Sequence, residues 1–149
     1  MPEANPIQVN VDTDLFAKTD ESAYILSTPA RQMRIAFTTN NDIILAATYI
    51  SMIGGATKQP GETTALYSKA HQIMQRVADQ TGRSVRYVFG TRRPKLALWA
   101  ASAGNKIVSW DRVDRIDGID ADDKTLLDPS KPFVAEKTYY PRQKSEYGD

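Results

Sequence analysis

Residues 58–64 combine residue types that could hold an anion. Their sequence is Lys58-Gln59-Pro60-Gly61-Glu62-Thr63-Thr64, and they connect an apolar run to a segment with helical periodicity. The free backbone N–H groups of a helix start, together with the helix dipole, favour an anion at that position. A glycine lets a phosphate approach the backbone. The alternative is structural: a glycine-containing loop in which Thr63 or Thr64 caps the helix.

The apolar run before this loop predicts a central strand. Residues 43–53 are nearly continuously apolar, as expected for a strand buried on both faces, and Gly54-Gly55 ends the run. Residues 33–38 alternate between apolar and polar side chains, and residues 39–42 between the two runs are turn formers. The two runs therefore predict a β-hairpin.

The chain after the loop predicts a helix, a strand, a second helix and a strand. The first helix has one apolar face with helical spacing and ends at Gly82; the residues of this face are Leu66, Ala70, Ile73, Met74 and Val77. Residues 84–90 predict a strand, and Pro94 suits the first turn of a helix that continues to residue 103. Residues 107–116 predict a last strand.

These elements predict an α/β (α+β) fold with a mixed, largely antiparallel sheet of about six strands and helices after the central strand. Short strands at residues 7–11 and 23–27 precede the hairpin, and the strand–helix–strand unit of residues 43–89 is expected to hold parallel or splayed strands. One domain is expected over residues 1–127. Prolines and charges dominate residues 128–149, which predicts a polar, mobile tail.

The order of elements resembles the core of the GCN5-related N-acetyltransferase (GNAT) superfamily, over roughly residues 33–116. In that superfamily a central strand leads into an Arg/Gln-x-x-Gly-x-Gly/Ala loop and a helix, whose amides hold the coenzyme A pyrophosphate. Lys58-x-x-Gly61-x-Thr63 occupies the same frame here. The next strand of the family diverges from its neighbour and leaves a cleft for the pantetheine arm, and residues 85–89 take that place. The family's following helix corresponds to residues 93–104.

The resemblance implies an acyl-CoA N-acyltransferase-like fold that binds acetyl-CoA (acetyl-coenzyme A) as acyl donor and transfers the acetyl group to an amine of a small molecule or a protein. It implies Lys58, Gly61, Thr63 and Thr64 as cofactor-binding residues. It also implies a catalytic role for Tyr49, which lies near the end of the central strand and suits a hydrogen-bond donor in the cleft. A homodimer is left open.

Two other classes of function remain as alternatives. Glu62 places a negative charge in the loop and Pro60 removes an amide donor, which favours a non-catalytic interaction protein with a degenerate cofactor loop. A basic cluster interleaved with aromatic residues is typical of RNA-binding sheets; its members are Arg83, Arg86, Arg92, Arg93 and Lys95. Strand alternation separates Arg86 from Tyr87, and the net charge is only +1, so the sequence argues against a nucleic-acid partner.

Composition narrows the chemistry further. The 149 residues include no cysteine and a single histidine, His71, so the sequence predicts no disulfide, no cysteine nucleophile and no metal site. His71 is expected to be a partly exposed helix residue. No apolar run approaches the ~18 residues of a spanning helix, and no signal-peptide pattern is found. We therefore expect a soluble cytoplasmic protein without a membrane partner.

Overall fold

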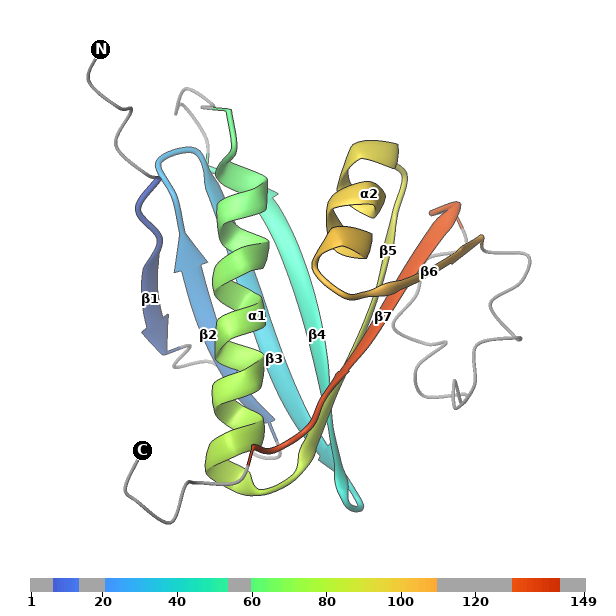
Figure 1. Cartoon of the computed structure of the whole chain (residues 1–149). Helices are drawn as coiled ribbons and strands as arrows, with labels where there is room; N and C mark the ends of the chain where they lie inside the picture. Colours follow the sequence, from blue (N-terminus) through green and yellow to red (C-terminus); the bar gives the residue numbers. More distant parts are fainter. Residues whose placement is uncertain (1–6, 14–20, 54–59, 110–129, 143–149) are drawn as a thin grey trace.

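The computed structural model describes residues 7–13, 21–53, 60–109 and 130–142, which form a seven-stranded sheet with two helices (Figure 1). The strands are β1 (Asn10–Thr13), β2 (Glu21–Ser27), β3 (Arg31–Asn40), β4 (Ile43–Met52), β5 (Ser84–Thr91), β6 (Lys106–Ser109) and β7 (Phe133–Tyr139). The helices are α1 (Glu62–Thr81) and α2 (Pro94–Ser102). The expected α+β class with a mostly antiparallel sheet is confirmed, with seven strands where about six were expected.

The strands lie in the order β1-β2-β3-β4-β5-β7-β6. Among the described strands, β4 and β5 form the single parallel pair, and every other neighbouring pair is antiparallel. Both helices cover the same face of the sheet (Figure 1), and they meet through the rings of Tyr67 and Trp99, whose centroids are 6.0 Å apart. The main apolar core lies between this face and the two helices.

The elements with strong local signals form as expected. The β3–β4 hairpin turns at Asn41, whose φ of 56° lies in the left-handed region that asparagine tolerates. The apolar face of α1 is buried, with Leu66, Met74 and Ala78 inaccessible to solvent, and Gly82 ends the helix at a φ of 70°. Within the described ranges, neither helix combines the length and apolar character that crossing a membrane requires.

Strand β7 corrects the expectation that residues 128–149 form a tail outside the core. It lies between β5 and β6 and pairs with both, and Val134 and Ala135 are almost completely buried. Three consecutive polar residues, 136–138, interrupt the alternation of apolar and polar side chains by which a strand is predicted. In the structure these residues have tertiary partners: Glu136 Oε1 lies 3.9 Å from Arg86 Nε, and Lys137 Nζ donates to the Ala103 carbonyl at 2.9 Å.

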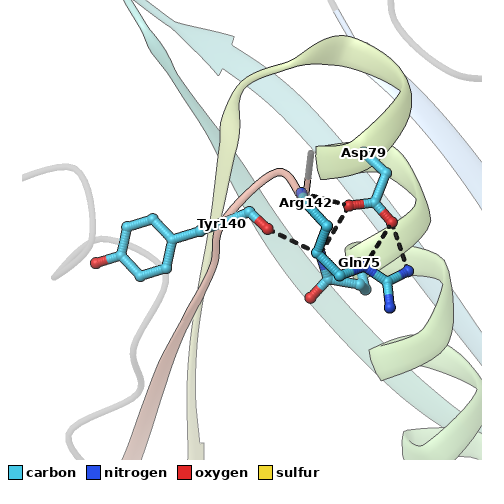
Figure 2. A network of polar contacts seen from close by, with 4 residues as sticks. All are labelled: Gln75, Asp79, Tyr140 and Arg142. Atoms are coloured by element: carbon cyan, nitrogen blue, oxygen red, sulfur yellow. Dashed lines mark hydrogen bonds and ion pairs between the residues drawn. The ribbon is translucent and has the colours of Figure 1, made fainter. Parts of the chain in front are cut away.

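The residues after β7 are attached to the C-terminal half of α1 (Figure 2). The Arg142 side chain donates from Nε and Nη2 to Asp79 Oδ2 at 3.0 and 2.6 Å, and its backbone N–H donates to Oδ1. Gln75 Nε2 donates to the Tyr140 carbonyl at 2.8 Å. These bonds to Arg142 hold the pKa of the Asp79 carboxyl well below its usual range. Residues 140–142 therefore connect the end of β7 to α1.

Strands β4 and β5 are paired only in their first halves. Residues 43–46 pair with residues 84–87, whereas β4 stays paired with β3 as far as Met52 and β5 with β7 as far as Thr91. The two strands therefore diverge (Figure 1), and no described strand fills the gap between them. The expectation that the central strand is buried on both faces is wrong for its second half, where Tyr49 is 59% and Met52 is 53% exposed.

Candidate functional site

A cavity of about 600 Å³ lies between the diverging halves of β4 and β5. Residues 47–50 of β4 and residues 88–91 of β5 form two of its walls. Thr63 and Tyr67 of α1 and Leu96 of α2 contribute further side chains to its lining. The cavity therefore occurs where the parallel pairing stops, and one end of it reaches the first turn of α1.

The charged side chains that line this cavity are all basic. They are Arg31, Arg92, Arg93 and Lys131, and the lining residues within the described part of the chain include no aspartate or glutamate. Arg31 is buried, whereas Arg92 and Arg93 are exposed at the start of α2. Arg92 Nε donates to the Ser130 carbonyl at 2.8 Å, which attaches this arginine to the segment before β7. A cavity with this lining favours an anionic ligand.

Three hydroxyl groups gather where β4 and β5 begin to separate. Thr48 Oγ1 and the Tyr87 hydroxyl are 2.5 Å apart, and Tyr87 occupies the last paired position of β5. Burial raises the pKa of the Tyr67 phenol, and the neighbouring Thr48 hydroxyl and the Arg93 charge offset this only in part. Burial also raises the pKa of Tyr87 well above its usual range. Both phenols are therefore protonated at neutral pH and can donate hydrogen bonds.

The sequence does not predict this cluster of three hydroxyls, because its members come from three separate elements. In the sequence, Tyr67 lies within the segment of helical periodicity and Thr48 lies within the apolar run of residues 43–53. Strand alternation does place Thr48 on the same face as Ile44 and Ala46, which was the one available signal. The contact between Thr48 and Tyr87 joins residues 39 positions apart, so no local pattern reveals it.

The structure brings some of the predicted site residues to the cavity. Tyr49 and Thr63 line it, and Tyr49 is largely exposed. Gly61 and Thr64 are not among the lining residues, and Thr64 is exposed in the first turn of α1. Lys58 lies outside the described residues. The four described members of the predicted site therefore all lie at β4 or at the start of α1, but only two of them face the cavity.

The start of α1 differs from the expected threonine cap. Gly61 is the N-cap, with a φ of 85° that favours glycine, and no side chain caps the helix. Glu62, the first residue of the helix, is 1% exposed, and its Oε1 accepts a hydrogen bond from the Ala30 backbone N–H at 2.8 Å. The Glu62 carboxylate is thus directed toward the β2–β3 connection and is not among the residues that line the cavity.

The basic cluster considered for RNA binding is divided between different surroundings. Arg86 lies near Glu136 of β7, whereas Tyr87 is buried in the core beneath the helices. Arg92 and Arg93 line the cavity, and Arg83 is exposed beyond the end of α1. These arginines therefore do not form one continuous basic and aromatic surface on the sheet.

His71 is partly buried among aromatic rings on the helix-covered face. Its ring centroid lies 6.0 Å from that of Tyr87 and 5.5 Å from those of Trp99 and Tyr139. Neither ring nitrogen has a hydrogen-bond partner among the described residues. Burial lowers the pKa of His71 to about 4, and the positive charge of Lys137 adds to this effect. The imidazole is therefore neutral at physiological pH.

This pKa predicts acid-sensitive stability. The unfolded chain takes up a proton near pH 6.5, whereas the folded protein does so only near 4, so the stability present above pH 6.5 is lost as the pH falls toward 4. The His71→Phe variant keeps a ring but does not titrate. Between pH 7 and 5 we expect its free energy of unfolding to fall by about 1 kcal/mol less than that of wild type; the effect is no larger because His71 is only partly buried and solvent screens its charge. Urea unfolding at both pH values measures this. Equal losses in the two proteins would contradict it.

Comparison with known proteins identifies no relative of this chain. No protein-family model matches the chain, and neither a curated protein nor a solved structure shows a significant match. The function is therefore argued from the sheet, the cavity and the residues that line it.

Proposed function

We propose that the cavity binds an acyl-CoA and that the protein is an N-acyltransferase that moves an acetyl group from acetyl-CoA to an amine. One observation carries this proposal: the single described parallel pair of strands separates after residues 46 and 87 and leaves a cavity at its open end. The acetyltransferase superfamily that the sequence resembles holds the pantetheine arm in such a gap. The order of strands and helices around the gap supports the same assignment.

The facing edges of β4 and β5 suit a pantetheine arm. Backbone N–H and C=O groups on strand edges need hydrogen-bond partners, and the two amides of the arm supply groups of the same kind. The basic lining residues complement the phosphates of the donor. The start of α1 adds the positive end of a helix dipole beside Thr63. Shape and charge therefore both favour a long anionic ligand with an amide-containing arm.

The hydroxyls of Thr48, Tyr67 and Tyr87, where β4 and β5 begin to separate, suit acyl transfer. The amine nitrogen of the acceptor forms a bond to the thioester carbonyl carbon, the carbon–sulfur bond breaks, and the amine loses one proton while the departing sulfur gains one. Tyr67 is a protonated phenol that lines the cavity and can donate a hydrogen bond to the carbonyl oxygen or the sulfur. Tyr49 is exposed on β4 and lines the cavity, and we assign it to contact with the acceptor.

The binding claim is tested by thermal unfolding with acetyl-CoA. At 100 times its dissociation constant the ligand should stabilise the protein by about 2.7 kcal/mol, a rise of roughly 5–10 °C in the melting temperature for a chain of this size. Ala47→Trp should reduce this shift strongly, because Ala47 lines the cavity and is only partly buried. Ala101→Trp is the matched control, because Ala101 is exposed on α2 and is not among the lining residues. No shift in wild type at millimolar ligand would refute the proposal.

The transfer claim has its own assay. The chain contains no cysteine, so every thiol that appears during incubation with acetyl-CoA and an amine comes from released coenzyme A. Thiol release that requires both the amine and the open cavity supports acetyl transfer. Binding without release over a broad panel of amines would favour the alternative of a non-catalytic protein that keeps the ligand site.

A further inference from the structure

Arg31 is a buried cation among the residues that line the cavity. It is the first residue of β3, on the same face as Met33 and Ile35 of the core, and it is only 6% exposed. It is one of the residues that line the cavity, and its side-chain Nε has no hydrogen-bond partner among the described residues. Arginine is almost never this deeply buried unless it is paired.

The backbone around Arg31 is held in place. The Arg31 carbonyl accepts hydrogen bonds from the Thr28 backbone N–H at 2.9 Å and the Thr28 hydroxyl at 3.2 Å. The carbonyl of the preceding residue, Ala30, accepts a hydrogen bond from the Ile53 N–H at 2.9 Å, and the Ala30 N–H donates to Glu62 Oε1. This anchoring fixes the backbone that carries Arg31 before any ligand arrives, which lowers the entropy lost on binding.

The neighbouring carboxylate, that of Glu62, has a backbone partner. Glu62 Oε1 accepts the Ala30 N–H, and Glu62 is not among the cavity-lining residues. Thr63 from the first turn of α1 does line the cavity, so a buried guanidinium and the positive end of a helix dipole face the same space. Two other lining cations, Arg92 and Arg93, precede α2 and are exposed to solvent.

We propose that Arg31 is the oxyanion-binding residue of this cavity and that its guanidinium binds a phosphate or carboxylate group of the ligand. A guanidinium donates two parallel hydrogen bonds to such a group, and burial strengthens them relative to bonds at the rim. The assignment of the anion to an acyl-CoA rests on the proposed function, whereas the anion site itself does not. Two sources of the oxyanion are distinguished by experiment: a phosphate of the acyl donor, or a carboxylate on the acyl group or the acceptor.

Calorimetric titration of wild type, Arg31→Met and Arg31→Lys tests the site with inorganic pyrophosphate, succinate, acetyl-CoA and uncharged acetyl-pantetheine. Arg76→Met is the matched control, because Arg76 is exposed on α1 and does not line the cavity. We expect Arg31→Met to weaken binding of at least one anion by about tenfold or more, with a smaller loss in Arg31→Lys and none in Arg76→Met. Acetyl-pantetheine should bind wild type and Arg31→Met alike.

The pattern of losses identifies the source of the anion. A loss for pyrophosphate and acetyl-CoA assigns Arg31 to a phosphate, and a loss for succinate alone assigns it to a carboxylate. Loss of pyrophosphate binding in a protein that ignores acetyl-CoA would support the anion site and refute the acyltransferase. Equal acetyl-CoA binding by wild type and Arg31→Met, with no other anion affected, would refute the anion site and leave the acyltransferase standing. Absence of binding by all three anions to wild type would refute both.

A second measurement avoids dependence on a variant that fails to fold. The Nε–H of Arg31 gives its own nitrogen-edited NMR signal in wild type, identified by its absence from Arg31→Lys. We expect pyrophosphate or succinate to shift this signal and to leave that of Arg76 in place. An Arg31 signal that stays unchanged while either anion binds would overturn the proposal.

Discussion

Removal of residues 128–149 should abolish cooperative folding. The deletion takes away β7, which is paired along its length with β5 and is the neighbour that holds β6 in the sheet. It removes Val134, Ala135 and Tyr139 from the core and leaves the edge of β5 that faces away from β4 unpaired. A central strand contributes both ladder hydrogen bonds and buried area, so its loss exceeds the roughly 5–15 kcal/mol by which a domain is stable. Circular dichroism and thermal unfolding of the truncated chain measure this.

A point variant separates the strand from the segment that follows it. Arg142→Ala keeps β7 and removes the side-chain bonds to Asp79, which form on the surface of α1. We expect it to lower the free energy of unfolding by less than about 1 kcal/mol, because exposed ion pairs contribute little. A truncated protein that melts like wild type would show that β7 is dispensable and would restore the view of this segment as a tail.

Glu62→Leu should be the most damaging single substitution at the start of α1. The change removes a carboxylate that is 1% exposed and leaves the Ala30 N–H without its acceptor. A buried donor deprived of a charged acceptor costs about 3 kcal/mol, and the favourable position of an acid at the helix start is lost as well. Urea unfolding gives the free energy directly. Thr64→Ala, in the same turn but exposed, should change it by less than about 0.5 kcal/mol.

Glu62→Gln tests the direction of this side chain. The amide keeps an oxygen that can accept from Ala30, so we expect a smaller loss of stability than in Glu62→Leu. Because Glu62 is not among the residues that line the cavity, the substitution should leave acetyl-CoA affinity within about twofold. A clear increase in affinity would instead mean that the carboxylate repels the ligand from within the loop.

Local sequence determined the elements whose stability is mostly local. The β3–β4 hairpin follows from alternation and turn residues, with Asn41 taking the positive φ that the turn requires. The buried face of α1 follows from helical spacing, and Gly82 and Pro94 mark a helix end and a helix start. The composition of the loop before α1 also predicts an anion site, and Thr63 from this region lines the cavity.

Tertiary structure decided what depends on partners distant in the chain. The sequence does not predict β7, because Glu136 and Lys137 are polar residues in its centre. Their contacts with Arg86 and Ala103, which exist only in the folded protein, stabilise them in a central strand. The burial of Glu62 and of Arg31 likewise depends on where the β2–β3 connection meets α1.

The cavity also depends on tertiary structure. The residues of β4 and β5 specify strands, but the point at which the two strands part is fixed by what each pairs with on its other side, β3 and β7. Periodicity predicts which face of a single helix or strand is buried, because apolar side chains recur every few residues along that element. Which strands become neighbours, and where a gap opens between them, is a balance of contacts across the whole chain, and for that reason only the folded structure brings Thr48, Tyr67 and Tyr87 to one place.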